Sequence, residues 1–185
     1  MKAFKGFDKD MKCRGYQFKI GRTEIEDEAN CVRNGFHCAE NPLDCLLYYP
    51  DTRNSIYCIV RAEGDIDEDD HDSKISCTEL TPLVEITLQH LFYEAVLYMA
   101  RHPERKMHTL VKEGSGAANE NGYVVVRGQR PTATAKGGDI ITLIETHPDK
   151  PSLILDACVK QIPAGKKKAT YALLNHQIVE VIILK

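Results

Sequence analysis

Residues 31–50, CVRNGFHCAENPLDCLLYYP, gather three cysteines, a histidine and two carboxylates, side chains that can bind a metal or act as nucleophiles. Zinc prefers thiolate and imidazole ligands, but structural zinc sites usually place paired cysteines about two to four residues apart. Cys31, Cys38 and Cys45 are seven residues apart. His37 and Cys38 would be neighbours in a strand and point to opposite faces. The spacing therefore favours thiols packed in a core and predicts no metal site.

An acidic segment, DIDEDDHDS at residues 65–73, has part of the pattern of a calcium-binding loop. Asp65, Asp67 and Asp69 show the alternate spacing that begins an EF-hand loop. Asp70 stands where that loop needs glycine, and Ser76 stands where it needs a bidentate glutamate. The segment therefore predicts a solvated loop, with weak calcium binding as the alternative.

Basic side chains in the second half of the chain are the best candidates for a binding surface. Three consecutive lysines fall in a predicted hairpin loop, and three further cations lie in the glycine-rich part before it. Such charges can follow the phosphates of an RNA or of a host ribonucleoprotein. The alternative is a solubilising turn with lysines that protect strand edges, and few aromatic residues are present between them for base stacking. The candidate binding residues are Arg127, Arg130, Lys136, Lys166, Lys167 and Lys168.

Charge and composition limit the class of protein. The 185 residues are 43% hydrophobic, enough for a core, and carry a net charge of −3. Residues 1–103 hold 12 Lys and Arg against 19 Asp and Glu, whereas residues 104–185 hold 12 against 8, so only the second part favours a polyanion. No apolar run approaches the roughly 20 residues of a membrane span, and the N-terminus lacks a signal-peptide segment. We therefore expect a cytoplasmic protein with reduced cysteines and no membrane partner.

The apolar pattern predicts two domains. Residues 1–103 read as an α+β domain of short strands, with a helix that starts at Asn41-Pro42 and one long helix over residues 82–101, ended by Pro103. Residues 104–185 read as a β-rich domain, in which glycines separate short β-branched runs. This sequence pattern favours stacked strands or a very short β-solenoid.

Three segments, MKAFKGFDKDMKCRGYQF, NGFHCAENPLDCLLYY and DSKISCTEL, occur in this order and resemble an uncharacterised domain family of phage, prophage and gut-bacterial proteins. The resemblance covers about the first 100 residues well and the rest loosely. It implies a mobile-element origin and an architecture in which a helix, an Ala/Gly/Ser-rich β-solenoid and a small β-cap follow the first domain. Here the solenoid is shortened to about two rungs. The resemblance supplies no catalytic residues.

The order of RGYQF, GFHCAENPLDCLLYY and YCIVRAEG also looks like the strand and helix order of ADP-ribosyltransferases. That resemblance implies NAD as the cofactor, with Arg14 on its phosphates and His37 and Tyr48 lining the nicotinamide pocket. The glutamate that orients the ribose hydroxyl in such enzymes has no clear place, since Glu63 only adjoins the strand and Glu180 is in the other half. Without it, the charge that develops in the reaction lacks its main support.

The sequence thus favours binding over catalysis. We expect an accessory protein of a phage or prophage, without catalytic residues, metal or cofactor, that binds a host protein or ribonucleoprotein in the host cytoplasm. An anti-defence inhibitor, such as an anti-CRISPR protein, is the specific form. The alternatives are an NAD-binding enzyme of the ADP-ribosyltransferase type and a structural module that forms homo-oligomers.

Overall fold

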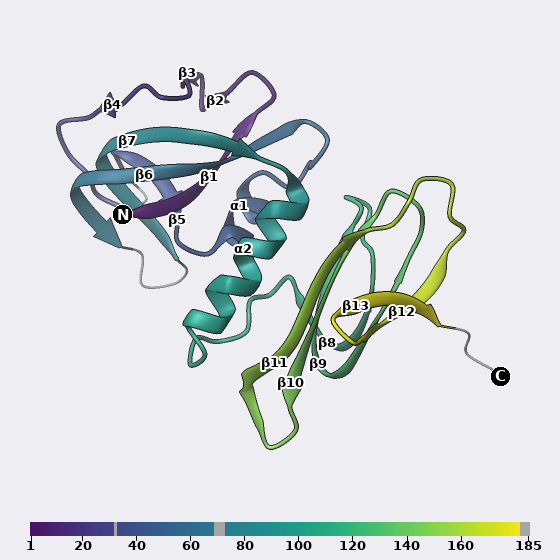
Figure 1. The fold of residues 1–185 in the computed structure, drawn as a ribbon. Helices are drawn as coiled ribbons and strands as arrows, with labels where there is room; N and C mark the ends of the chain where they lie inside the picture. The colour runs from purple at the N-terminus through teal and green to yellow at the C-terminus, as the bar shows by residue number, and fades with distance from the viewer. Residues whose placement is uncertain (32, 69–72, 182–185) are drawn as a thin grey trace. The chain divides into compact units, whose positions relative to one another are not determined.

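The computed structural model describes residues 1–31, 33–68 and 73–181, and the chain divides into two compact units, Met1–Leu91 and Phe92–Lys185 (Figure 1). The described residues are mostly β, with 55% in strands and 12% in helices. The first unit contains β1 (Lys2–Asp8), β2 (Lys12–Cys13), β3 (Tyr16–Gln17), β4 (Glu24–Ile25), β5 (Phe36–Ala39), α1 (Pro42–Tyr48), β6 (Ser55–Glu68) and β7 (Lys74–Ile86). Helix α2 (Leu88–Arg101) begins in the first unit and continues in the second, which contains β8 (Val111–Ala117), β9 (Tyr123–Ala135), β10 (Ile140–His147), β11 (Lys150–Gln161), β12 (Ala169–Leu174) and β13 (Gln177–Val181).

Four strands of the first unit form a closed antiparallel ring. β1 pairs with β5 on one side and with β6 on the other, and β7 pairs with both β5 and β6. The short β4 adds to β7. Figure 1 shows how strongly β6 and β7 curl to make this possible. Closure removes most free strand edges from this unit.

The closed ring of four strands encloses a core that is rich in aromatic side chains and thiols. The rings of Phe7 and Phe18 have centroids 5.1 Å apart, and those of Phe18 and Phe36 are 5.6 Å apart. Cys58 and Cys77 are fully buried beside them. The core consists of Ala3, Phe7, Phe18, Phe36, Cys38, Cys58, Val60, Ala62, Ile75, Cys77 and Leu80.

Helix α1 begins as the sequence predicts. Asn41 is the N-cap, its side-chain oxygen accepts from the Leu43 amide at 3.1 Å, and Pro42 occupies the first turn. Asp44 is buried and accepts from the Ser73 hydroxyl at 2.5 Å and the Ser73 amide at 3.2 Å. The helix is thereby tied to the start of β7.

The prediction of an α+β N-terminal domain with one long helix over residues 82–101 is wrong. Both helices are short, and residues 82–86 complete β7, where Tyr57 pairs with Ile86 and Val60 with Pro82. A register shift next to Pro82 accommodates a residue that cannot donate to the ladder. Long-range pairing with β6 thus decides the state of a segment whose local pattern fits a helix equally well. β6 likewise continues to Glu68, through the start of the predicted acidic loop.

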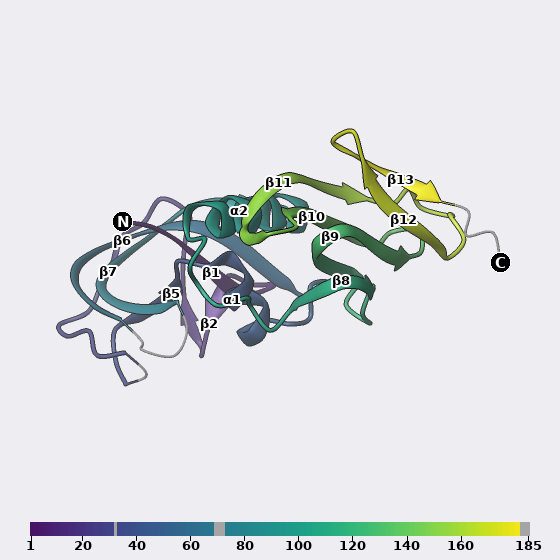
Figure 2. The ribbon, with the colours of Figure 1, turned by 90° about the horizontal axis from the view of Figure 1, so that it is seen from below.

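The second unit is a curled sheet with the order β11-β10-β9-β12-β13, and β8 lies beside β9. β8, β9 and β10 are parallel neighbours in chain order (Figure 2). β9 bends at Gly128, so that its first half pairs with β10 and its second half with β12. A Cβ on Gly128 would lie 3.0 Å from the backbone nitrogen of Gly114, so this corner needs glycine.

The bend folds the two halves of this sheet over a second core, in which Ile141, Leu143 and Ile178 are fully buried. The Phe92 ring of α2 contacts Tyr123, with centroids 5.1 Å apart. β11 and β13 approach each other without pairing, and Lys160 Nζ donates to the Ile178 carbonyl at 2.8 Å between them. Helix, bend and side-chain bonds together hold the second unit closed.

Candidate functional sites

A lysine inside the ring of the first unit is the feature that sequence reasoning missed. Lys5 alternates with Ala3 and Phe7, which are core residues, and only 5% of it is exposed. Its ammonium donates to the His37 carbonyl at 2.6 Å and lies 3.6 Å from the Cys13 sulfur. It also lies 5.4 Å from the centroid of the Phe7 ring. The only sequence signal is that Lys5 falls on the apolar side of an alternating strand.

His37 lies on β5 within a group of cations. The residue is half-buried, and desolvation lowers its pKa, with further lowering by the charges of Lys5, Lys74 and Arg14. Arg14 occupies the turn between β2 and β3 with a left-handed φ of 50°. The positive charge of Arg14 therefore acts on His37 in the folded domain.

Tyr48 joins this group through a lysine. It is exposed at the C-terminal end of α1, and Lys74 donates to its hydroxyl at 3.2 Å and lies 5.4 Å from its ring centroid. The charge of Lys74 also lowers the pKa of His37, so Lys74 interacts with both Tyr48 and His37. Glu63 lies on β6. Its side chain is exposed to solvent and accepts a hydrogen bond from Arg61 Nε at 2.7 Å. Glu180 belongs to β13 of the second unit.

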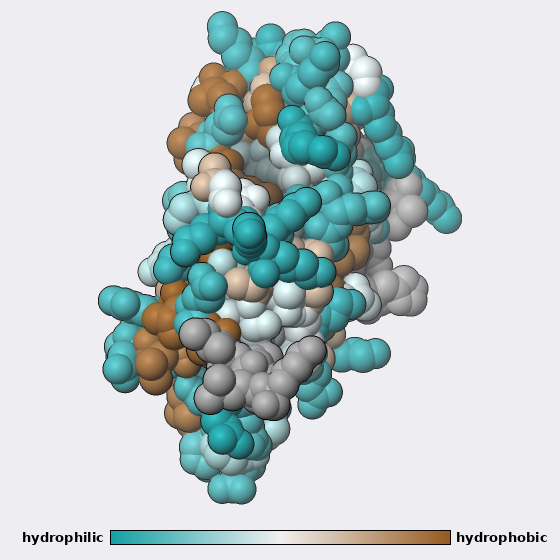
Figure 3. Space-filling model, turned by 90° about the vertical axis from the view of Figure 1, so that its right-hand side faces the viewer, coloured by the Kyte–Doolittle hydropathy of each residue, from teal (hydrophilic) through white to brown (hydrophobic). Residues whose placement is uncertain are grey.

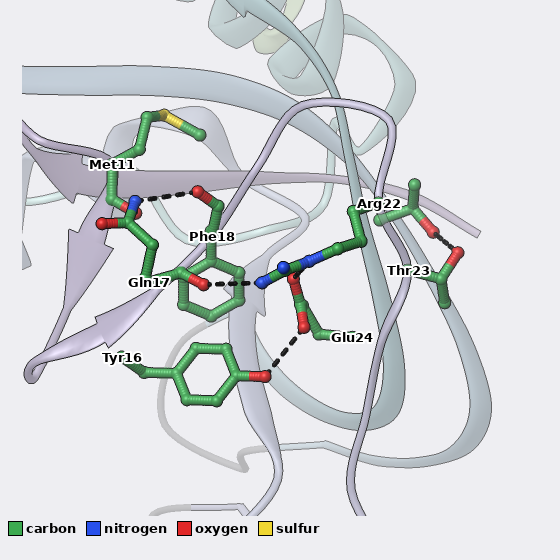
Figure 4. A network of polar contacts seen from close by, with 8 residues as sticks. Met11, Tyr16, Gln17, Phe18, Arg22, Thr23 and Glu24 are labelled. Carbon is green, nitrogen blue, oxygen red and sulfur yellow. Dashed lines mark hydrogen bonds and ion pairs between the residues drawn. The ribbon is translucent and has the colours of Figure 1, made fainter.

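A polar network holds the segment that carries Arg14 (Figure 4). The carboxylate of Glu24, a residue only 6% exposed, accepts from the Tyr16 hydroxyl at 2.8 Å and from Arg22. The Arg22 guanidinium also donates to the Gln17 carbonyl at 3.1 Å. The Thr23 and Thr81 hydroxyls lie 2.8 Å apart, which connects the segment to β7. These bonds hold the segment that follows Arg14 in place, although Arg14 itself is exposed.

The thiols of the opening motif pack as core residues. Cys38 and Cys45 are buried, as predicted, and Cys31 is half-buried. Burial raises the pKa of Cys45 to about 12, and a hydrogen bond to Cys77 together with burial raises the pKa of Cys38. Within the described residues, no three His, Cys, Asp or Glu side chains are grouped so as to hold a metal ion. Asp69 and Asp70 of the calcium hypothesis lie outside that part of the chain.

We expect the stability of the first unit to fall in mild acid because of His37. Since its pKa is lowered in the folded state from the usual 6.5, the unfolded chain binds the proton more readily. Stability should therefore decrease as the pH falls below about 6.5 and level off below the folded-state pKa. Urea midpoints at about pH 7.5 and about pH 5.5 should differ less in His37→Gln than in wild type. Equal pH dependence in the two proteins would contradict this assignment.

Comparison with known families gives one match. The model described as Domain of unknown function (DUF7666) matches residues 1–94. The chain belongs to this family. No curated protein and no solved structure matches the chain. The matched residues contain the whole ring and the Arg14–His37 group, so the DUF7666 domain includes this candidate site and carries no assigned function.

The lysines of the second unit come together on two adjoining turns. The Gly137 amide donates to the Lys166 carbonyl at 2.9 Å, and the Gly138 amide donates to the Ile162 carbonyl at 2.9 Å. The turn after β9 is thereby bonded to the turn after β11. All four lysines on these turns are exposed, and Lys166 Nζ lies 3.5 Å from Glu180. We call this group the lysine corner: Lys136, Lys166, Lys167 and Lys168.

The two arginines of the predicted binding set have other surroundings. Arg127 is half-buried and donates to the carbonyls of Pro151 at 2.8 Å and Ser152 at 3.2 Å, and burial lowers its pKa. Its bonds hold β9 against the start of β11. Arg130 is exposed at the bend of β9 and lines a separate pocket. The structure therefore brings together four of the six predicted binding residues.

Neither α1 nor α2 is long and apolar enough to span a bilayer within the residues that the structure covers. On the face drawn in Figure 3, hydrophilic residues predominate and hydrophobic ones gather in small patches.

Proposed function

We propose that this protein acts by binding, and that the lysine corner contacts the phosphate backbone of an RNA, free or within a host ribonucleoprotein. The observation that carries the proposal is the hydrogen-bonded pair of turns, which concentrates four lysines from distant parts of the chain. A fixed set of ammonium groups can neutralise successive phosphates and release their counterions. Two carboxylates lie at this corner: that of Glu180 is 3.5 Å from Lys166 Nζ, and that of the buried Asp139 accepts from the Lys136 backbone amide at 2.9 Å. Among the described residues, the ammonium groups of Lys136, Lys167 and Lys168 form no ion pair.

Substitution of the three other lysines is expected to weaken RNA binding in a salt-dependent way. For a single strand, each phosphate contact contributes about −0.7 to the slope of log K against log salt concentration. Lys136→Ala, Lys167→Ala and Lys168→Ala together should therefore reduce the steepness of that slope by about 2. The measurement is fluorescence anisotropy with a labelled oligouridylate at several salt concentrations.

A matched triple variant controls for the loss of net charge. Lys9→Ala, Lys19→Ala and Lys106→Ala remove three exposed lysines that lie outside helices and strands and outside the lysine corner. This control should keep the wild-type slope and affinity. The proposal is overturned if both triple variants bind the RNA alike.

The biological role that we propose is that of a phage or prophage accessory protein with an anti-defence function. It rests on the resemblance of the N-terminal segments to proteins of mobile elements and on a binding surface that suits a ribonucleoprotein. Expression of the protein in cells with an RNA-guided defence should raise the plating efficiency of a targeted phage, and the lysine-corner triple variant should not. Wild-type levels of defence in cells that express the protein would contradict the role.

A further inference from the structure

The second unit contains an open pocket of about 500 Å³, within the size range of small-ligand sites. Its polar residues come from the bend of β9, from the facing strands β10 and β11, and from the turn between β12 and β13. Apolar surface is added by β12, where Leu174 is 59% exposed. The lining residues are Arg130, Thr132, Glu145, Asp156, Ala172, Leu173, Leu174, Asn175 and His176.

The backbone around this pocket is unusual. Of the five non-glycine residues with positive φ in the described chain, Arg130, Asn175 and His176 all line it, with φ of 45°, 49° and 62°. Asn175 and His176 form the two-residue turn of the β12–β13 hairpin, where the second position favours glycine. Asp156 offsets the cost of a non-glycine residue at this position. Its carboxylate accepts from the His176 amide at 3.1 Å and lies 2.7 Å from Nδ1 of the His176 ring. The turn is therefore held on β11, and the oxygens of Asp156 are used in holding it.

Two opposite charges in the pocket remain uncompensated. Glu145 lies directly opposite Asp156 on the neighbouring strand, an arrangement of like charges that is unfavourable on its own. Arg130 follows two residues after Gly128, which pairs with Glu145. The backbone of Glu145 pairs with both neighbouring strands, but no hydrogen bond or ion pair joins the side chain of Arg130 or Glu145 to another described residue. The pocket thus presents a free carboxylate and a free guanidinium from adjacent strands.

We propose that this pocket binds a small zwitterion, a molecule with one ammonium group, one carboxylate and a short aliphatic part, such as a free α-amino acid. Glu145 receives the ammonium, which also relieves its repulsion from Asp156. Arg130 binds the carboxylate through its planar fork of donors, and Leu174 with Ala172 contacts the aliphatic part. A simple anion would leave Glu145 without a partner. A divalent metal lacks a third ligand, since no metal-holding group of three is found in the described chain.

Three related ligands separate the two charged contacts. Leucine carries both charges, N-acetylleucine lacks the ammonium, and leucinamide lacks the carboxylate. Titration of the full chain, followed by ¹H–¹⁵N spectra, should shift the amide signals of Thr132, Leu174 and His176 with leucine. N-acetylleucine and leucinamide should each bind at least about ten-fold more weakly than leucine, the loss expected for one charge-assisted contact.

Variants then assign each contact. Glu145→Gln should bind leucine no better than N-acetylleucine, and Arg130→Gln should bind leucine no better than leucinamide. Glu120→Gln and Arg101→Gln, exposed residues outside the pocket, should keep the wild-type preferences. Absence of signal shifts with leucine at millimolar concentration, or equal affinity of wild type for all three compounds, would overturn the proposal. Since the lysine corner is not altered, the result is independent of RNA binding.

Discussion

Phe7→Ala is expected to lower the free energy of unfolding of the first unit by about 3–5 kcal/mol, the usual loss for a large aromatic in a core. Phe7 is completely buried, and its ring packs 5.1 Å from that of Phe18. The closed ring of four strands leaves little freedom to collapse onto the cavity. The same cavity would remove one of the aromatic faces that surround the Lys5 ammonium at 5.4 Å. The loss should therefore fall in the upper half of that range.

Because the chain divides into two compact units and Phe7 lies in the first, this effect should be measured on the first unit alone. Native-state hydrogen exchange, read by mass spectrometry on peptides from residues 1–91, gives its opening free energy. Ile25→Ala, at a site 71% exposed on β4, should change that value by no more than about 0.5 kcal/mol. A loss below about 1 kcal/mol in Phe7→Ala would mean that the ring is not closed as described.

Gly137→Ala is expected to damage both the stability of the second unit and the lysine corner. A Cβ at this position would lie 2.8 Å from the backbone atoms Gly165 N, Lys166 N and Pro163 O. Backbone atoms cannot rotate away, so the two turns must separate and the bond from Gly137 to the Lys166 carbonyl is lost. Overpacking of this kind costs about 1–3 kcal/mol. RNA affinity should fall with stability, because the lysines no longer share one surface.

Lys136→Ala is the matched control for this experiment. It removes one ammonium group but leaves the backbone bonds between the turns in place. It should weaken RNA binding while the opening free energy of peptides from residues 92–185 stays at the wild-type value. If Gly137→Ala keeps wild-type stability and affinity, the two turns do not hold the lysines together.

Local features of this chain could be predicted where a few neighbouring residues decide the outcome. Asn41 and Pro42 start α1 because an N-cap oxygen and a proline at the first position act within a single turn. Buried Cys38 and Cys45 follow from small apolar thiols at the wrong spacing for zinc. Chemistry of this kind depends on sequence neighbours alone.

Features that depend on distant partners could not be predicted. Residues 82–86 have the apolar spacing of a helix, but they form a strand because they pair with β6. Arg127 looks like a surface cation, yet the start of β11 supplies two carbonyls that bind it. Arg130 is separated from the lysines by the bend of β9 and becomes part of a pocket.

The amino-acid sequence alone was sufficient to locate the start of α1, the β-rich second half and the excess of positive charge in it. Only the tertiary structure decided that four strands close into a ring around Lys5, that Lys136 joins Lys166–Lys168, and that Glu145 and Arg130 lie unpaired in one pocket. The physical reason is that capping, propensity and charge act over a few residues. Ring closure, turn packing and pocket formation instead depend on backbone pairing between residues that are tens of positions apart.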